Sequence, residues 1–360
     1  MIYSVLRRVL FQFEPETIHA LTLTLLRLTG AIPPMYWAAS LLYRAPARSV
    51  QAFGLTFRNP VGLAAGYDKD GLGIRGLAAL GFGHIEIGTV TPLPQKGNPK
   101  PRVFRLAEDD ALINRMGFPS RGSEFVQSRL NSGLSTGWVE RYVGISRRKP
   151  TIKRRSFPVK VGVNLGKNKE TPNDQAAFDY LALLQNFAPL ADYLTINVSS
   201  PNTEGLRKLQ ERDALEGLLT HLHQQRLIEQ EQLKRRVPIL VKLSPELSDQ
   251  ELDDALDVIL RTHMDGLIIT NTSLQRRGLR SLKQSEVGGL SGSPLRAQSE
   301  AMLQKVMGRS KGEIPVVSVG GIMSAEDAKR RLDMGATLVQ IYTGLIYRGP
   351  GVVRAIARNL

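Results

Sequence analysis

Cysteine is absent from this 360-residue sequence. Its absence excludes disulfide bonds, Cys-ligated zinc sites, iron–sulfur clusters and cysteine nucleophiles. Long apolar runs are absent as well. The longest early stretch without charge, 28–43, contains two prolines and is shorter than the roughly 20 residues of a membrane-spanning helix. Glu14, Pro15 and Glu16 interrupt the first apolar run where a secretory signal would continue. We therefore expect no segment that crosses a bilayer.

Acidic residues are scarce relative to basic ones. The chain has 33 Asp and Glu against 48 Lys and Arg, which gives a formal net charge of +15. Part of the excess forms a cluster free of acidic residues: Arg141, Arg147, Arg148, Lys149, Lys153, Arg154 and Arg155. No RNA- or DNA-binding signature accompanies this cluster, so we expect no nucleic-acid partner. A solvated loop, lipid headgroups and a partner subunit are the three interpretations of it.

The first 45 residues are predicted to form an apolar helical arm. Apolar residues at helical spacing predict helices over 1–13 and 16–29, and the segment 35–43 is apolar on nearly all sides. Such an arm needs a second apolar partner. It either caps the body of the protein or lies in a membrane interface, where arginine and aromatic side chains would anchor it.

From residue 58 onward the chain alternates short apolar strands with amphipathic helices. We expect strands at 60–65, 83–88, 159–164, 192–198, 238–243, 265–271, 314–320 and 337–342. We expect helices near 71–80, 173–187, 213–233, 248–262, 297–308, 324–334 and 351–359. This pattern predicts an α/β fold, a parallel (β/α)₈ barrel over 46–360 with a basic insert at about 135–158. A doubly wound open sheet shares the same repeat, but polar residues follow nearly every strand, and a barrel would gather them at one mouth.

One motif points to a different fold. Gly71, Gly73 and Gly76 match the spacing of a dinucleotide-binding loop. However, the residues Tyr67 to Asp70 separate the preceding strand from the first glycine, so the required tight turn from strand to helix is missing. We therefore do not expect a nicotinamide site.

The residues after the strands predict the chemistry of the mouth. Lys69, after the first strand, would place a cation there for a substrate carboxylate, or would simply pair with Asp68 or Asp70. Asn164, Asn197 and the run Thr270-Asn271-Thr272 end three further strands. Carboxamides donate and accept hydrogen bonds at once, which suits a planar heterocycle. Lys242 lies in an apolar strand and needs an anionic partner, such as the electron density of a reduced flavin.

The last two strands predict a phosphate seat. Gly320-Gly321 precedes a helix-start signal at Ser324, and Tyr342-Thr343-Gly344 follows the eighth strand. Loops after strands seven and eight bind phosphate in many barrels. A single seat beside a flat-ring site favours FMN over a dinucleotide. The stretch 192–205, a strand that ends in Asn197-Val-Ser-Ser-Pro-Asn202, carries the densest group of polar residues.

Together these residues resemble one family, the class 2, quinone-dependent dihydroorotate dehydrogenases. The matching motifs span nearly the whole chain: Ala-Ala-Gly-Tyr-Asp-Lys-Asp-Gly (64–71), Gly-Thr-Val-Thr-Pro (88–92), Lys-Pro-Arg-Val-Phe-Arg-Leu (100–106), Ile-Asn-Arg-Met-Gly-Phe (113–118), Asn-Leu-Gly-Lys-Asn-Lys (164–169), Ile-Asn-Val-Ser-Ser-Pro-Asn-Thr (196–203), Thr-Asn-Thr (270–272), Gly-Gly-Leu-Ser-Gly (288–292), Val-Gly-Gly-Ile (319–322) and Gln-Ile-Tyr-Thr-Gly (340–344). The stretch between Phe118 and Val161 is longer than the bacterial pattern of the family.

The resemblance implies roles for individual residues. For FMN it implies contacts from Ala65, Gly66, Thr89, Asn164, Asn197, Lys242, Thr270, Gly292, Gly321, Tyr342 and Thr343. For the substrate it implies Lys69, Asn114, Arg115, Met116, Gly117, Phe118, Asn197, Asn202, Asn271 and Thr272. It makes Ser200 the general base, where class 1 relatives carry a cysteine, and places His19, Arg102 and Tyr342 at a quinone site in the arm. It implies no metal.

The expected reaction has two halves. Ser200 takes a proton from C5 of dihydroorotate while C6 gives a hydride to FMN, and a membrane quinone then accepts the electrons. We expect a peripheral protein of the cytoplasmic face of a bacterial inner membrane, acting in pyrimidine biosynthesis, since no Arg- and Ser-rich transit segment precedes the first helix. The alternatives are another FMN barrel that reduces a pyrimidine, whose members typically use a cysteine, and a colourless membrane- or RNA-bound scaffold.

Overall fold

The computed structural model describes residues 2–131 and 154–360. Eight parallel strands close into a barrel in the order β10-β12-β13-β3-β4-β7-β8-β9. The strands are β3 (Val61–Leu63), β4 (His84–Val90), β7 (Lys160–Leu165), β8 (Tyr193–Asn197), β9 (Ile239–Leu243), β10 (Gly266–Ile269), β12 (Val316–Val319) and β13 (Leu338–Ile341). Each coincides with an expected strand. The predicted (β/α)₈ barrel is confirmed, and the open sheet is excluded.

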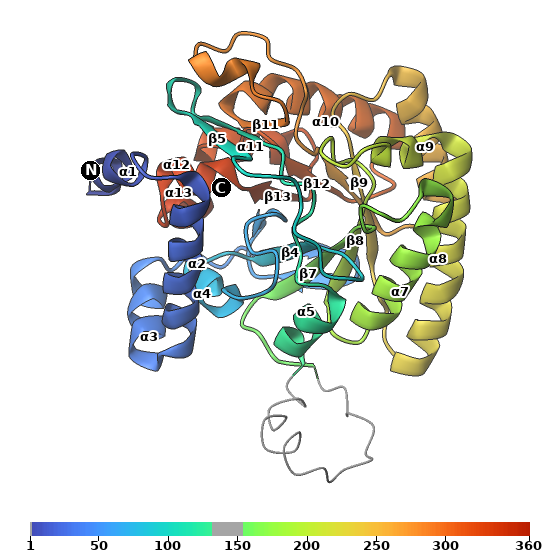
Figure 1. Ribbon diagram of the computed structural model, residues 1–360. Helices are drawn as coiled ribbons and strands as arrows, with labels where there is room; N and C mark the ends of the chain where they lie inside the picture. Colours follow the sequence, from blue (N-terminus) through green and yellow to red (C-terminus); the bar gives the residue numbers. More distant parts are fainter. Residues whose placement is uncertain (1, 132–153) are drawn as a thin grey trace.

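Helices cover the outside of the barrel (Figure 1). They are α4 (Ile74–Ala79), α5 (Ser123–Leu130), α7 (Ala176–Phe187), α8 (Arg212–Leu233), α9 (Asp249–Arg261), α10 (Arg296–Ser310), α11 (Ala325–Asp333), α12 (Thr343–Arg348) and α13 (Val352–Arg358). Ser248 and Ser324 begin α9 and α11 with complete capping boxes. The sequence did not predict α5 and α12.

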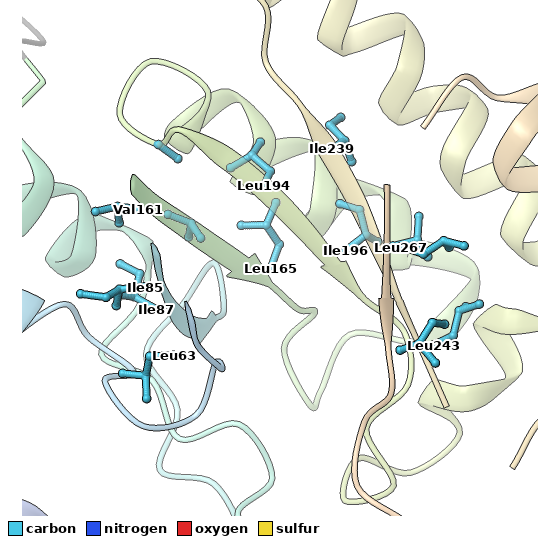
Figure 2. Close-up of a cluster of buried hydrophobic side chains, with 14 of the residues drawn as sticks. Leu63, Ile85, Ile87, Val161, Leu165, Leu194, Ile196, Ile239, Leu243 and Leu267 are labelled. Atoms are coloured by element: carbon cyan, nitrogen blue, oxygen red, sulfur yellow. The ribbon is translucent and has the colours of Figure 1, made fainter. Parts of the chain in front are cut away.

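The strands bury apolar side chains on both faces. Outward-facing residues such as Leu194, Ile239 and Leu267 pack against the helices (Figure 2). Inward-facing residues form a second core, closed from below by the hairpin of β1 (Val50–Ala52) and β2 (Leu55–Phe57). Because apolar side chains fill the lower interior of the barrel, ligands have access only from the C-terminal ends of the strands.

An antiparallel sheet lies over the C-terminal ends of the strands and was not predicted. It joins β5 (Val103–Leu106), β6 (Ala111–Asn114) and β11 (Gly289–Gly292) in the order β11-β6-β5. Its register pairs Asn114 with Gly289. Residues that lie far apart in the sequence are therefore brought together beside the mouth.

The arm consists of α1 (Ile2–Leu10), α2 (Pro15–Ala31) and α3 (Pro33–Leu42), close to the three predicted helical segments. It lies along one side of the barrel, with α2 packed against α4 (Figure 1). The approach is close because a Cβ at Gly76 of α4 would lie 2.0 Å from the carbonyl oxygen of Leu26 in α2. Among the described residues, no helix is long and apolar enough to cross a membrane.

Most of the predicted basic insert lies outside the described residues. The described residues nearest to it on either side lie together. Asn131 and Arg154 form an antiparallel bridge, and the backbone N–H of Arg155 donates to the carbonyl of Leu130 at 2.8 Å. Arg154 also pairs with the carboxylate of Asp192 at the start of β8. The interpretations of the cluster at 141–155 therefore stay predictions.

Candidate functional site

A cavity opens at the C-terminal ends of the barrel strands, with an empty volume of about 1020 Å³ that includes open solvent. Its walls come from the ends of β3, β4, β8, β9, β10, β12 and β13 and from the β6 and β11 strands of the covering sheet. The polar side chains of the wall are Lys69, Thr89, Asn114, Asn197, Ser200, Asn202, Lys242, Thr270, Asn271, Thr272, Ser291, Gln340, Tyr342 and Thr343. The barrel thus gathers the polar strand ends at one mouth.

A chain of amides forms one wall of the cavity. The hydroxyl of Thr89 donates to Oδ1 of Asn164 at 2.6 Å, and Nδ2 of Asn197 donates to the same oxygen at 3.0 Å. Nδ2 of Asn271 donates to Oδ1 of Asn197 at 3.2 Å. Three strand ends and the β10 loop are therefore connected by side-chain hydrogen bonds. The wall offers both donors and acceptors to a planar polar ring.

A second amide pair faces this wall. Nδ2 of Asn202 donates to Oδ1 of Asn114 at 3.2 Å, which links the loop after β8 to the covering sheet. Ser200 lies in the same loop, is 5% exposed, and accepts a hydrogen bond from the backbone N–H of Asn202 at 3.3 Å. No carboxylate or imidazole of the described residues hydrogen-bonds to Ser200.

Arg207 holds the loop that carries Ser200. Its guanidinium donates to the carbonyls of Ser199 and Thr272, both at 3.2 Å, and pairs with Glu246 at 2.9 Å. One side chain thus ties the loop after β8 to the loop after β10, a role that no sequence motif predicts.

Two lysines place positive charge in the wall. Burial lowers the pKa of Lys69 to about 8, and Asp70 and Glu16 oppose that shift. Burial also lowers the pKa of Lys242, and the carboxylate of Glu86 opposes it. Among the described residues Lys69 has no ion pair with Asp68 or Asp70, whose carboxylates accept backbone N–H groups instead. In the part of the chain that the structure describes, neither lysine nitrogen therefore has a contacting carboxylate.

Glycines form one corner of the cavity. Gly321 has φ of +75°, and a Cβ there would lie 2.4 Å from the Cα of Arg296. A Cβ at Gly344 would lie 2.6 Å from the carbonyl oxygen of Ile322. A side chain would therefore not fit at either of these two glycines. The corner lies between the loop before α11 and the first turn of α12, which is the place of the predicted phosphate site.

Aromatic rings connect the arm with the cavity. The ring of His19 in α2 contacts the ring of Tyr67 edge to face, with centroids 4.9 Å apart, and Tyr67 lies 5.9 Å from Tyr342. Burial and the charge of Lys69 lower the pKa of His19 to about 3, so the imidazole is neutral at physiological pH. Arg102 pairs with Glu16 of α2 at 3.0 Å.

Most predicted site residues line the cavity, and four do not: Asn164, Arg115, His19 and Arg102. Asn164 lies directly behind Thr89 and Asn197. The side chain of Arg115 turns away, because its guanidinium stacks on Phe104 and pairs with Glu286 at 2.7 Å. The side chain of Arg115 therefore lies outside the cavity wall, and its predicted substrate contact stays a prediction.

Several cavity or neighbouring residues were not predicted. Gln340 and Ser291 line the wall, and Tyr67 bridges from the arm. Glu86 of β4 is fully buried below the cavity, where Asn164, Gln340 and Tyr193 donate hydrogen bonds to it. A glutamate in an apolar strand was a signal that could have identified this last position.

Comparison with known proteins gives concordant results. A family model described as dihydroorotate dehydrogenase matches residues 48–360. The protein named dihydroorotate dehydrogenase (quinone) from Chromobacterium violaceum is 46% identical over 359 residues, covering 99% of this chain and 97% of that protein. The protein of the same name from Halorhodospira halophila is 45% identical, again covering 99% and 97%. A crystal structure of DHODH from Eimeria tenella in complex with ferulenol has a TM-score of 0.82 and 40% identity, covering 96% of this chain and 90% of that one.

Proposed function

The chain belongs to the dihydroorotate dehydrogenase family, and from that premise we propose that it oxidises (S)-dihydroorotate to orotate with a quinone as the final electron acceptor. This is the quinone-dependent reaction named for relatives that match the chain over nearly its full length. The reaction belongs to pyrimidine biosynthesis. The observation that carries the proposal is the amide-lined cavity with two lysines at the mouth of the barrel.

FMN is the proposed cofactor, and the residues present fit it. Its phosphate would lie in the corner of Gly321 and Thr343, its ring against Ala65, Gly66 and the amide wall. The remaining proposed contacts are Thr89, Asn164, Asn197, Lys242, Thr270, Gly292 and Tyr342. Asn164 would act through Thr89 and Asn197, to which it is hydrogen-bonded. Bound FMN would supply a two-electron acceptor and donor, and the protein supplies position and charge.

The substrate would bind between the amide wall and the loop 116–118. Lys69 would pair with its carboxylate, and Asn114, Asn202 and Asn271 would hydrogen-bond to its ring. The other proposed contacts are Met116, Gly117, Phe118, Asn197 and Thr272, with Arg115 contributing through its backbone. Ser200 would accept the proton from C5. A serine hydroxyl is a weak base, so its proton must pass on to water or to another polar group.

The quinone would enter through the arm. His19, Arg102 and Tyr342 are the proposed contacts, because the ring contacts His19–Tyr67–Tyr342 lead from α2 to the cavity. The arm exposes large apolar side chains: Val5, Leu6, Val9, Phe13, Leu21, Leu25, Leu28, Ile32, Met35, Trp37, Leu41 and Leu42. We place this surface in the membrane interface, at the cytoplasmic face of a bacterial inner membrane.

Anaerobic addition of dihydroorotate to the purified protein tests the proposal. The yellow protein should lose its flavin absorbance, and a quinone should restore it while NAD and fumarate do not. A colourless protein, or a flavin that dihydroorotate leaves oxidised, contradicts the proposed activity. Restoration by NAD or fumarate contradicts the proposed acceptor.

A further inference from the structure

A buried carboxylate lies inside the barrel one layer below the cavity. Glu86 of β4 is 0% exposed, yet three side-chain donors converge on it. Nδ2 of Asn164 lies 2.8 Å from Oε1, and Nε2 of Gln340 and the hydroxyl of Tyr193 lie 3.0 and 3.4 Å from Oε2. Such a set of donors is what an ionised carboxylate requires when it is removed from water.

The surroundings favour this charge. Lys242, from β9, interacts favourably with Glu86, and each is buried in the barrel interior. Burial lowers the pKa of His84 to about 3, while burial and the charge of Glu86 raise the pKa of Tyr193 well above its usual range. Both of these neighbours are therefore neutral at physiological pH, so neither of them adds a charge beside Glu86 and Lys242.

A carboxylate only accepts hydrogen bonds, so it fixes the orientation of each amide bonded to it. Asn164 must turn its NH₂ group down to Glu86, which leaves its oxygen to accept from Thr89 and Asn197. Asn197 must then turn its NH₂ group toward Asn164, which leaves its oxygen to accept from Asn271. In this series of hydrogen-bonded amides, the orientation of Asn197 and Asn271 thus follows from that of Asn164.

Gln340 follows the same rule on the other side. Its NH₂ group donates to Glu86, and its Oε1 is buried without a hydrogen-bond partner among the described residues. Gln340 lines the cavity. Because its NH₂ group is bound to Glu86, the carboxylate sets which end of this amide faces away from it.

We propose that Glu86 is a positioning residue that sets the donor and acceptor directions of the amide wall through Asn164 and Gln340. The inference rests on the proposed function, because it takes the ligand of the wall to be FMN. Glu86 itself does not touch the cavity. Its effect on the cofactor would therefore be indirect and would depend on the polarity of the residue at position 164.

That dependence gives a polarity-reversal test. Glu86→Gln removes the fixed acceptor, so the amides lose their imposed direction, and the dissociation constant for FMN should rise at least about tenfold, as for one buried hydrogen bond. Asn164→Asp should weaken FMN binding as well, because it sets one carboxylate against another. In the double variant the new amide at 86 can donate to the new carboxylate at 164, whose other oxygen still accepts from Thr89 and Asn197.

The double variant should therefore bind FMN within about threefold of wild type, a coupling that independent effects would not give. FMN release from each holoenzyme is measured by dilution and ultrafiltration, with thermal unfolding recorded alongside. A structural role alone predicts that FMN affinity follows thermal stability from variant to variant, and FMN losses that only follow the unfolding temperature overturn the inference, as do additive losses. So does Glu86→Gln protein that binds FMN like wild type.

Two further results complete the test. If Glu86→Gln does not fold, the double variant alone decides: flavin bound at nearly wild-type affinity supports the inference, and its loss overturns it. Glu86→Asp, which keeps an acceptor-only group, should bind FMN more tightly than Glu86→Gln, and the reverse order contradicts the inference. The proposed function is tested separately, because wild-type protein that lacks flavin would refute that function before any variant is compared.

Discussion

In the barrel, β4, β8 and β9 are buried along their full length, whereas α3 of the arm has no buried residue at all. In α2 only Leu26 and Gly30 are buried, and Trp37 and Leu41 of α3 are 70% and 77% exposed. The apolar side chains of these barrel strands are therefore buried within the protein itself. The arm leaves large apolar side chains exposed, which is the basis for proposing it as a docking region beside a catalytic barrel.

The largest effect that would sharpen this comparison is expected at the mouth. Ser200→Ala removes the proposed base, so reduction of the flavin by dihydroorotate should slow by about 10² to 10⁴-fold, the usual contribution of a positioned general base. FMN binding and vesicle binding should be unchanged, because Ser200 touches neither the glycine corner nor the arm. Stopped-flow absorbance under anaerobic conditions measures the rate. Undiminished flavin reduction would remove Ser200 from its role.

A smaller effect is expected on the arm. Trp37→Glu with Leu41→Glu places two charges on its most exposed apolar residues, and vesicle affinity should fall by about 10²-fold, since each change forfeits a buried apolar side chain. Flavin reduction by dihydroorotate should stay at the wild-type rate. Sedimentation with anionic vesicles measures binding.

Leu227→Glu on α8 provides the matched control. Leu227 is 50% exposed, and α8 lies on the opposite side of the barrel from the arm (Figure 1). It should leave vesicle binding unchanged. Equal losses in the control and in the arm variant would mean that exposed apolar residues bind lipid anywhere on the molecule, and the distinction between the two regions would fail.

The same contrast explains how much the sequence could predict. The eight barrel strands followed from short apolar runs, and the mouth followed from the polar residues that end them. The sheet β11-β6-β5 did not, because residues 111–114 pair with 289–292, and no local pattern encodes a pairing across so many residues. Long-range pairing is the part of a fold that periodicity does not report.

Two site residues illustrate the remaining limit. Asn114 and Arg115 are adjacent in a matching motif, but successive side chains along extended backbone point to opposite sides. Asn114 reaches the cavity, and Arg115 pairs with Glu286. A glutamate within the apolar run of β4 marks position 86 as unusual, but the run does not show what the carboxylate contacts. Its role depends on donors from β7, β8 and β13, which only the closed barrel brings together.

The joint between the two regions should show an effect on stability. Gly76→Ala would push a Cβ to 2.0 Å from the carbonyl oxygen of Leu26, so α2 must move away from α4. Overpacking of this kind costs about 1 to 3 kcal/mol in the free energy of unfolding. Gly217→Ala in α8 is the control, because a Cβ there meets nothing within 4 Å and should stabilise the helix by about 0.5 to 1 kcal/mol. Denaturant unfolding measures both, and equal signs would contradict the close packing.

The smallest effect is expected on the pH dependence of activity, because a charge in the arm acts on the pKa of a lysine in the cavity wall. Lys69 has its pKa lowered to about 8, and Glu16 of α2 is one of the charges that hold it from falling further. In the proposed complex the charged form of Lys69 binds the substrate carboxylate, so kcat/KM for dihydroorotate should fall above pH 8, by about tenfold for each pH unit. Glu16→Gln removes a charge that raises the pKa of Lys69, and the fall should begin at lower pH.

Glu14→Gln, in the same helix turn but outside the charges that act on Lys69, should leave the profile in place. If both variants match wild type, the arm and the mouth are electrostatically independent, and the two regions are more separate than their contacts indicate.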